Sequence, residues 1–337
     1  MKKTCTVMAV LALILALCAC GGGGGDKIIL IGADSTGKNA AGQLLGERIA
    51  ARTEELSGGR LVIDYHPNAE LGGDADLLRQ AQSGDIALVV CQTAPLVSFI
   101  PEMAVFDLPM LFAGCDGETI SRALNGENDF HAALCKAYER AGFLPLGFLQ
   151  NATYRMTTSN RELRSLADFK GLQIRTMENK NHMDFWSAIG AEPTPLAWTE
   201  VFQALQTGMI DAQENAADTC VGANLQDVQK YLVNTEHILY LNQVLINQSV
   251  FDALPEELGA ALQQAVSEAV AELEPQLAEI DRANRELLVQ RGMTLIDCAD
   301  SLREEILALD AVQELYGRID ESTGALGALL AAELRKA

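Results

Sequence analysis

Residues 171–215 read GLQIRTMENKNHMDFWSAIGAEPTPLAWTEVFQALQTGMIDAQEN, and this stretch decides the fold class. A strand pattern, GLQIRT, precedes a helix pattern, NHMDFWSAIG, which ends at a glycine. The strand pattern EPTPLAW, the helix pattern TEVFQALQTG and the strand pattern MIDAQEN follow in turn. Strands that alternate with helices in this way are typical of layered α/β domains.

The same alternation extends to both sides of this stretch. Upstream, the segments KIILIG, RLVIDYHP, DIALVVC and FLPLGFL read as strands, and one helix is predicted over roughly 117–141. Downstream, TEHILYLNQVLINQSVF predicts extended segments that return across the first domain. A chain that crosses twice between two α/β lobes predicts a cleft with a hinge, which is a usual place for a small ligand.

A long helical pattern covers residues 255–292, PEELGAALQQAVSEAVAELEPQLAEIDRANRELLVQRG. Pro275 lies inside it. Proline lacks the amide donor and clashes with the preceding turn, so we expect it to kink or divide the helix. A hinge motion that bends the chain at this proline is a further hypothesis.

The first 26 residues read as an export and anchoring segment. Lys2 and Lys3 precede a short apolar run, and Leu-Cys-Ala-Cys ends at Cys20 before five glycines. This order predicts a lipoprotein signal peptide over 1–19, followed by a lipidated Cys20 and a flexible tether over 20–26. An ordinary signal peptide with incidental cysteines is the alternative.

Composition excludes several classes of function. The 337 residues carry a net charge of −21, and loss of Lys2 and Lys3 with the signal changes it to −23. Such a charge repels nucleic acid and anionic lipid head groups, so we expect no nucleic-acid partner and a soluble body held off the membrane. Five cysteines remain after the segment 1–20, scattered and without C-x-x-C spacing, so neither a metal nor another cofactor is predicted.

The segment GADSTGKN, residues 32–39, contains most of a phosphate-binding P-loop. Gly32, Gly37 and Lys38 fit G-x-x-x-x-G-K, but Asn39 stands where a P-loop needs Ser or Thr to ligate magnesium. An exported protein also meets little ATP. We therefore interpret the match as a coincidence between the end of a strand and the start of a helix.

Arg155, Arg175 and Asn215 are the strongest candidates for a binding site. Arg175 and Asn215 end strand patterns, and Arg155 follows an apolar pair of strands. Ligands of α/β sheets bind at the carboxyl ends of strands, so the three side chains are expected to converge on one edge of the cleft. Two guanidinium groups and an amide would receive a carboxylate. The alternative for either arginine alone is a surface ion pair with one of the 46 acidic residues.

Four segments resemble successive blocks of the DctP-type substrate-binding proteins of TRAP transporters. They are HPNAELGGDADLLRQAQSGDIALVV, PEMAVFDLPMLF, TTSNRELRSLADFKGLQIR and GAEPTPLAWTEVFQALQTGMIDAQEN. The resemblance extends from about residue 27 to at least residue 255. It implies a two-lobed α/β fold of the periplasmic-binding-protein kind, type II-like, with a cleft between the lobes and a long helix spanning both. The expected division is 27–152 plus about 241–280 for the first lobe, and 153–240 plus about 281–337 for the second.

The resemblance also implies roles for individual residues. Arg175 is similar to the family's arginine that forms a bidentate salt bridge with the ligand carboxylate, and the spacings to Arg155 and Asn215 agree with the family pattern. It places four further residues at ligand-contacting positions: Asp34, Gln92, Glu178 and Trp198. Gln92 replaces an acid that is frequent in sialic-acid binders, which counts against that ligand. Glu178 either faces the pocket or neutralises an arginine, and Trp198 either packs on the ligand skeleton or belongs to the core.

These observations predict an extracytoplasmic solute-binding lipoprotein, anchored to the outer face of the cytoplasmic membrane. As a monomer, it would capture a small carboxylate and deliver it to the TRAP membrane subunits, without catalysing a reaction. Two arginines with several acceptors favour a uronate or another sugar acid over a plain dicarboxylate. A ligand-sensing module for a membrane signalling protein is the first alternative. A secreted lipoprotein hydrolase is the second, although the chain has no G-x-S-x-G nucleophile motif.

Overall fold

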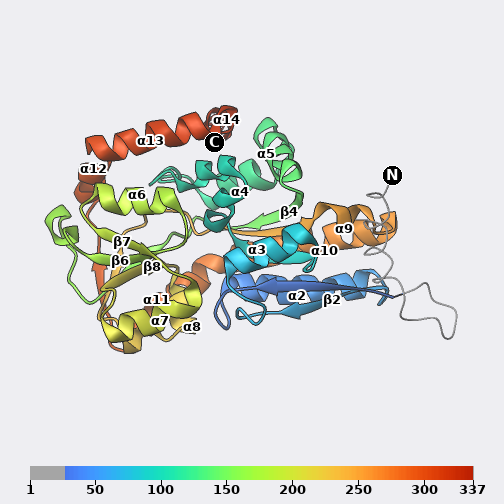
Figure 1. Cartoon of the computed structure of the whole chain (residues 1–337), viewed down its shortest axis with the longest axis horizontal. Helices are drawn as coiled ribbons and strands as arrows, with labels where there is room; N and C mark the ends of the chain where they lie inside the picture. The colour runs from blue at the N-terminus through green and yellow to red at the C-terminus, as the bar shows by residue number, and fades with distance from the viewer. Residues whose placement is uncertain (1–26, 337) are drawn as a thin grey trace, which may run out of the picture.

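The computed structural model describes residues 27–336, which form two α/β bodies side by side (Figure 1). We call them the first lobe, which carries a five-stranded sheet, and the second lobe, which carries a six-stranded sheet. The strand order is β2-β1-β3-β10-β4 in the first and β11-β9-β5-β8-β6-β7 in the second. The strands are β1 (Ile28–Asp34), β2 (Leu61–His66), β3 (Leu88–Gln92), β4 (Phe143–Leu149), β5 (Met156–Ser159), β6 (Gln173–Thr176), β7 (Glu192–Pro195), β8 (Ala212–Asn215), β9 (Tyr231–Asn234), β10 (Asn242–Asn247) and β11 (Thr294–Asp297).

Helices separate most of these strands along the chain. The α-helices are α2 (Ala41–Leu56), α3 (Asp74–Ser83), α4 (Gly117–Asn125), α5 (Asp129–Arg140), α6 (Lys180–Ala188), α7 (Trp198–Thr207), α8 (Ala217–Gly222), α9 (Gln248–Asp252), α10 (Glu256–Leu273), α11 (Leu277–Gln290), α12 (Asp300–Leu307), α13 (Asp310–Thr323) and α14 (Ala325–Leu334). The 3₁₀ segments are η1 (Ala94–Ser98), η2 (Pro101–Asp107), η3 (Leu166–Phe169), η4 (Leu225–Asp227) and η5 (Glu274–Gln276).

The sheet of the first lobe is covered on both faces. Val89 and Cys91 of β3 pack into the apolar cluster under α3, α4 and α5. Leu88 and Val90, which point the other way, pack into the cluster under α2 and α10. Successive side chains of a strand point to opposite faces, so a sheet covered twice requires the unbroken apolar run of DIALVVC.

The second lobe is built in the same way. The clusters on its two faces contain residues of α6, α12 and α13 on one side and of α7, α8 and α11 on the other. β10 crosses back into the first lobe, antiparallel between β3 and β4, as the extended pattern over 235–251 predicted. The α/β, two-lobed fold expected from the sequence is therefore confirmed.

The long helical pattern is divided at Pro275, as expected. η5, which contains Pro275, separates α10 from α11. α10 packs against α2 and β4 of the first lobe, whereas α11 packs against α8 of the second. The pair of helices therefore spans both lobes.

Two expectations about local structure are wrong. The single helix predicted over roughly 117–141 is two helices, because the Asn128 side chain accepts a hydrogen bond from His131 N and caps a new helix there. The strand pattern EPTPLAW ends at Pro195, and Trp198 is the first residue of α7.

The C-terminal helices run along one side of both lobes (Figure 1). α13 packs against α6 and η2, and α14 returns to α4 and α5 of the first lobe. Among residues 27–336, no helix is long and apolar enough to cross a membrane. The predicted signal peptide, the lipidated Cys20 and the whole glycine tether lie outside the described residues.

Candidate functional site

The register of the second sheet brings Arg155, Arg175 and Asn215 to one edge. β5 and β8 are antiparallel and pair Met156 with Asn215. β6 and β8 are parallel and pair Arg175 with Gln213. The residue before β5, the end of β6 and the end of β8 therefore lie at the same edge. All three side chains are buried.

Most of the Arg155 guanidinium is engaged within the protein. Its Nε donates to the Glu214 carboxylate in a salt bridge, and its Nη1 donates to Gln92 Oε1 of the first lobe. Its Nη2 donates to the Glu214 carbonyl oxygen at 2.8 Å and to Glu214 Oε1 at 3.1 Å. A guanidinium has five N–H donors, so these four bonds leave one for a ligand.

The Arg175 guanidinium is held from one side only. Its Nε and Nη2 donate to the Leu196 carbonyl oxygen at 2.9 and 2.6 Å. Its Nη1 is buried and has no hydrogen-bond partner within residues 27–336. Three of its five N–H donors therefore remain unbonded. Burial lowers the pKa of Arg175 to about 10, which leaves it charged at neutral pH.

A cavity of about 100 Å³ lies in front of Arg175. Its lining comes from both lobes, and the residues are Gly73, Asp74, Ala75, Asp76, Arg79, Pro95, Arg175, Met177, Glu178, Leu196, Ala197 and Trp198. The Trp198 ring lies 5.6 Å from the Arg175 guanidinium carbon, in a cation–π contact. The volume is below that of drug-sized pockets, so this form of the cleft suits a small organic acid.

Asp74 is a candidate site residue that the sequence reasoning missed. It is the first residue of α3, it lines the same cavity as Arg175, and its Oδ1 accepts a hydrogen bond of 2.5 Å from Ser35 Oγ. Burial raises its pKa, against the charges of Arg175 and Arg155, which lower it. Its position next to Gly73, at the start of a helix pattern, was the available signal.

The remaining predicted residues differ in their exposure and in how many hydrogen bonds they already make within the protein. Asp34 is buried; its Oδ1 accepts from Thr36 N and Oγ1, both at 2.7 Å, and its Oδ2 accepts from Tyr65 at 2.7 Å. Glu178 is exposed at the rim of the cavity. Asn215 Oδ1 accepts from Ala216 N at 3.0 Å. A ligand contact by each of these residues stays a prediction.

A network of buried charged and polar groups lies behind Arg155, and sequence reasoning missed it. His182 of α6 lies 3.1 Å from Asp107 of η2 and 3.9 Å from Glu214. His237 Nε2 lies 3.3 Å from Glu214 Oε2. These residues are far apart in the sequence; the only signal was that Glu214 stands next to Asn215 in AQEN.

The charges of this network balance one another. Burial opposes the charge on Glu214, but Arg155, the hydrogen bond with His237 and the nearby charge of His182 hold its pKa well below the usual range. Burial also opposes the charge on His182, but Asp107 and Glu214 raise its pKa to about 9. Burial lowers the pKa of His237, which is neutral at pH 7. Two cations therefore face two carboxylates, Asp107 and Glu214.

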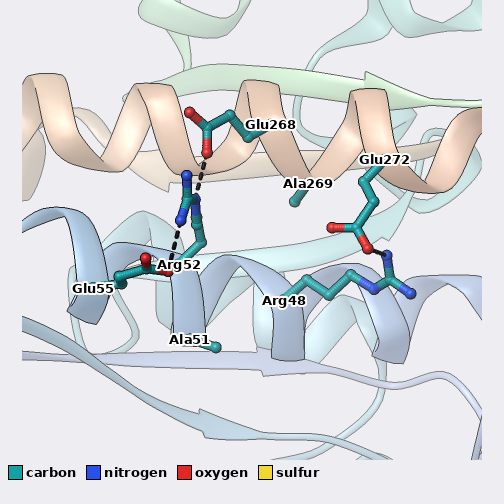
Figure 2. A pocket seen from close by; sticks show the side chains of 7 residues that line it. All are labelled: Arg48, Ala51, Arg52, Glu55, Glu268, Ala269 and Glu272. Carbon is teal, nitrogen blue, oxygen red and sulfur yellow. Dashed lines mark hydrogen bonds and ion pairs between the residues drawn. The ribbon is translucent and has the colours of Figure 1, made fainter.

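A second hollow, of about 380 Å³, lies between α2 and α10 (Figure 2). It also contains two arginines. Arg52 pairs with Glu55 and Glu268, and Arg48 pairs with Glu272. Because both guanidiniums already face carboxylates and solvent, this hollow lacks the unpaired buried cation found at Arg175. The smaller cavity, which Arg175 lines, is therefore the better candidate for an anion-binding site.

Within residues 27–336, no group of three or more His, Cys, Asp or Glu side chains is placed to hold a metal ion. The five cysteines of this region are free thiols. The arginine edge and the cavity in front of Arg175 are the candidate ligand-binding features that we consider further.

Two α/β lobes, a pair of helices that spans them, and a buried cation facing a cavity between them define the class of two-lobed solute-binding proteins. Residues 35–321 match the family DctP, described as bacterial extracellular solute-binding protein, family 7. The chain belongs to this family, that of the substrate-binding proteins of TRAP transporters.

Individual relatives agree with this assignment. A solute-binding protein of Verminephrobacter eiseniae is 32% identical over 277 residues, which are 80% of this chain and 79% of that one. A TRAP periplasmic solute-binding protein from Polaromonas sp. JS666, solved bound to D-erythronate, is 27% identical with a TM-score of 0.81 and covers 91% of this chain and 98% of its own. The sugar acid binding protein DctPAm of Advenella mimigardefordensis, solved with galactonate, is 24% identical and shares the fold, with a TM-score of 0.85 over 92% of this chain and 99% of its own.

Proposed function

We propose that this protein captures a small organic acid in the cleft and delivers it to the membrane subunits of a TRAP transporter. The observation that carries the proposal is the buried Arg175, which has three unbonded N–H donors and lines a cavity between the lobes. A buried guanidinium without a carboxylate partner is costly, and a ligand carboxylate would satisfy it through two parallel hydrogen bonds. Arg155 offers one further donor and Asn215 an amide at the same edge.

We further propose that the ligand carries hydroxyl groups as well as a carboxylate. Asp74 and Glu178 line the same cavity as Arg175, and carboxylate oxygens accept hydrogen bonds from hydroxyls. A plain dicarboxylate would place its second charge near these acids and be repelled. The binding of D-erythronate by a relative of the same fold is in line with this choice. A uronate or another sugar acid therefore fits best.

The mode of attachment belongs to the same proposal. The protein is exported and held by a lipid on Cys20, with residues 20–26 as tether, and it acts as a monomer that binds without turnover. Growth with a labelled fatty acid tests the anchor: the wild-type chain takes up label and Cys20→Ser does not. Label in both chains, or in neither, would refute lipidation at Cys20.

The first experiment is a thermal-shift screen of the purified protein with succinate, D-erythronate, D-galactonate and D-glucuronate. A ligand at a hundred times its dissociation constant adds about 2.7 kcal/mol to the free energy of unfolding. Arg175→Ala should weaken binding by about 2–5 kcal/mol, because the ligand carboxylate then has no buried partner. Arg164→Ala is the matched control, since Arg164 is exposed and pairs only with Glu162.

Two outcomes would contradict the proposal. Stabilisation by uncharged solutes alone would mean that Arg175 does not receive a carboxylate. A carboxylate that stabilises the wild type and Arg175→Ala to the same extent would place the anion elsewhere.

A further inference from the structure

The P-loop-like segment of the first lobe touches the second lobe. The backbone N–H of Ala41, the first residue of α2, donates to Asp218 Oδ2 of α8 at 2.8 Å. The preceding residue, Ala40, offers no side chain to cap this helix. A carboxylate at a helix N-terminus binds an otherwise unpaired N–H and interacts favourably with the helix dipole. The cap of α2 thus comes from a residue 177 positions away, in the other lobe.

The two backbones also meet next to this bond. A Cβ added at Gly37 would lie 3.4 Å from the Gly222 Cα, and one added at Gly222 would lie 3.1 Å from the Lys38 carbonyl oxygen. The latter distance is tighter than ordinary van der Waals contact. Two glycines facing each other therefore allow an approach of the lobes that larger residues would resist.

We propose that Asp218, Gly222 and the segment 37–41 form an interlobe latch that holds the cleft closed. The latch has the carboxylate on the second lobe and the helix N-terminus on the first. It gives the glycine-rich segment GADSTGKN a role without a nucleotide: the N-terminus of α2 receives a carboxylate of the protein itself.

The latch is connected to the ligand-binding edge. α8 begins two residues after Asn215, so a ligand held at the end of β8 lies beside the helix that carries Asp218. Asp218 Oδ1 accepts from Thr219 N at 2.6 Å, and Thr219 Oγ1 lies 2.9 Å from the Tyr240 hydroxyl. The Tyr240 ring in turn lies 6.0 Å from the Arg155 guanidinium carbon. This continuous series of contacts would let the occupied site favour the position of α8 that engages Ala41.

The buried carboxylate of Asp218 depends on the hydrogen bond from Ala41 for its satisfaction. Asp218 is buried, and burial raises its pKa against the hydrogen bonds from Ala41 and Thr219 that lower it. The nearby Asp281 of α11 is paired with Arg285 at 2.6 Å. A buried carboxylate that loses one of its donors is left partly unsatisfied, so opening the lobes exposes it to solvent or leaves it under-bonded.

The latch is tested by amide hydrogen exchange of Ala41, read by mass spectrometry or NMR in buffer alone. Asp218→Asn should speed exchange at Ala41 by roughly 2- to 30-fold, the range expected for loss of a helix N-cap. Asp227→Asn is the matched control: it removes the same charge from an exposed residue of the same lobe and should leave Ala41 unchanged. Equal exchange at Ala41 in the two variants would overturn the proposal.

A second pair of variants keeps the carboxylate and changes only the close approach. Gly222→Ala should also speed exchange at Ala41, because the added Cβ meets the Lys38 carbonyl, while alanine does not weaken α8 itself. Gly317→Ala on α13 is the matched control, since a Cβ there meets nothing within 4 Å. Unchanged exchange in Gly222→Ala would show that the lobes do not depend on this contact. Slow exchange at Val89, in the middle of β3, separates latch opening from general unfolding.

The latch rests on the lobes closing over a ligand, but its test does not require the ligand to be known. A failed carboxylate screen with altered Ala41 exchange would refute the proposed function and leave the latch. A successful screen that is lost in Arg175→Ala, with unaltered Ala41 exchange in both latch variants, would refute the latch alone.

Discussion

Arg155 and Arg175 lie at the same edge of the same sheet, yet their surroundings differ. Arg155 is enclosed by Glu214, by the Glu214 carbonyl and by Gln92, and four of its donors are bonded. Arg175 meets one carbonyl oxygen and one aromatic ring and leaves Nη1 unpaired. Both side chains are buried, with 1% and 2% of their surface exposed. Burial alone therefore does not distinguish an arginine whose charge is paired within the protein from one with unbonded donors.

The difference lies in the charge balance around each arginine. The carboxylate that offsets the charge of Arg155 belongs to Glu214 of β8. Arg175 has no such partner among residues 27–336, and the proposed ligand carboxylate would supply the missing counter-charge. The two proposed roles therefore differ: Arg155 is neutralised within the protein, whereas Arg175 would bind the ligand.

The largest effect is expected from removing the carboxylate of the enclosed arginine. Glu214→Gln leaves Arg155 as a buried charge without a counter-charge, and we expect the free energy of unfolding to fall by about 3–5 kcal/mol. Chemical denaturation measures this loss. Glu162→Gln is the control: its partner Arg164 is exposed, so the change should be below about 1 kcal/mol. If both variants lost a similar amount of unfolding free energy, the buried pair of Arg155 and Glu214 would contribute no more than an exposed pair.

The charged network around Arg155 should also contribute less to the stability of the fold at alkaline pH. The pKa of His182 rises from an ordinary 6.5 to about 9 in the folded protein. Its contribution is fully present below about pH 6.5 and is lost as the pH rises through about 9. The shift corresponds to stabilisation on the order of 3 kcal/mol.

Melting temperatures from about pH 6 to about pH 10, compared between the wild type and His182→Gln, measure this contribution. Glutamine keeps a donor for Asp107 but has no proton to lose. The melting temperatures of the wild type and of His182→Gln should therefore approach each other as the pH rises. A constant difference at all pH values would show that His182 is not charged in the folded protein.

A smaller effect, on ligand affinity, is expected from changing Trp198, which contacts Arg175. Trp198→Leu removes the cation–π contact with Arg175 and should weaken binding of the acid identified by the screen by about 1 kcal/mol. Trp198→Phe keeps a ring and should lose less. Titration calorimetry measures both. The chain has only one other tryptophan, the buried Trp186, so a ligand-induced change in tryptophan fluorescence should also disappear in both variants. Unaltered affinity in Trp198→Leu would place Trp198 outside the site.

The sequence by itself determined the alternation of strands and helices, the break at Pro275, the return of 235–251 to the first lobe, and the family. These follow from local periodicity, from the restricted backbone of proline and from the order of motifs. Local rules were less reliable at element ends: a cap at Asn128 split one predicted helix into two, and the strand before Trp198 ended early. The strand ends, together with the resemblance to the DctP-type family, also pointed to Arg155, Arg175 and Asn215 as candidates, and their contact with a ligand stays a prediction.

Only the tertiary structure decided which partners these residues have. Glu214 pairs with Arg155, and His182 lies between Glu214 and Asp107, because three elements of distant sequence pack together. Asp218 likewise caps a helix of the other lobe. Charge pairing and burial depend on distances in space. Periodicity records the face on which a side chain lies, but it carries no information about what packs against that face.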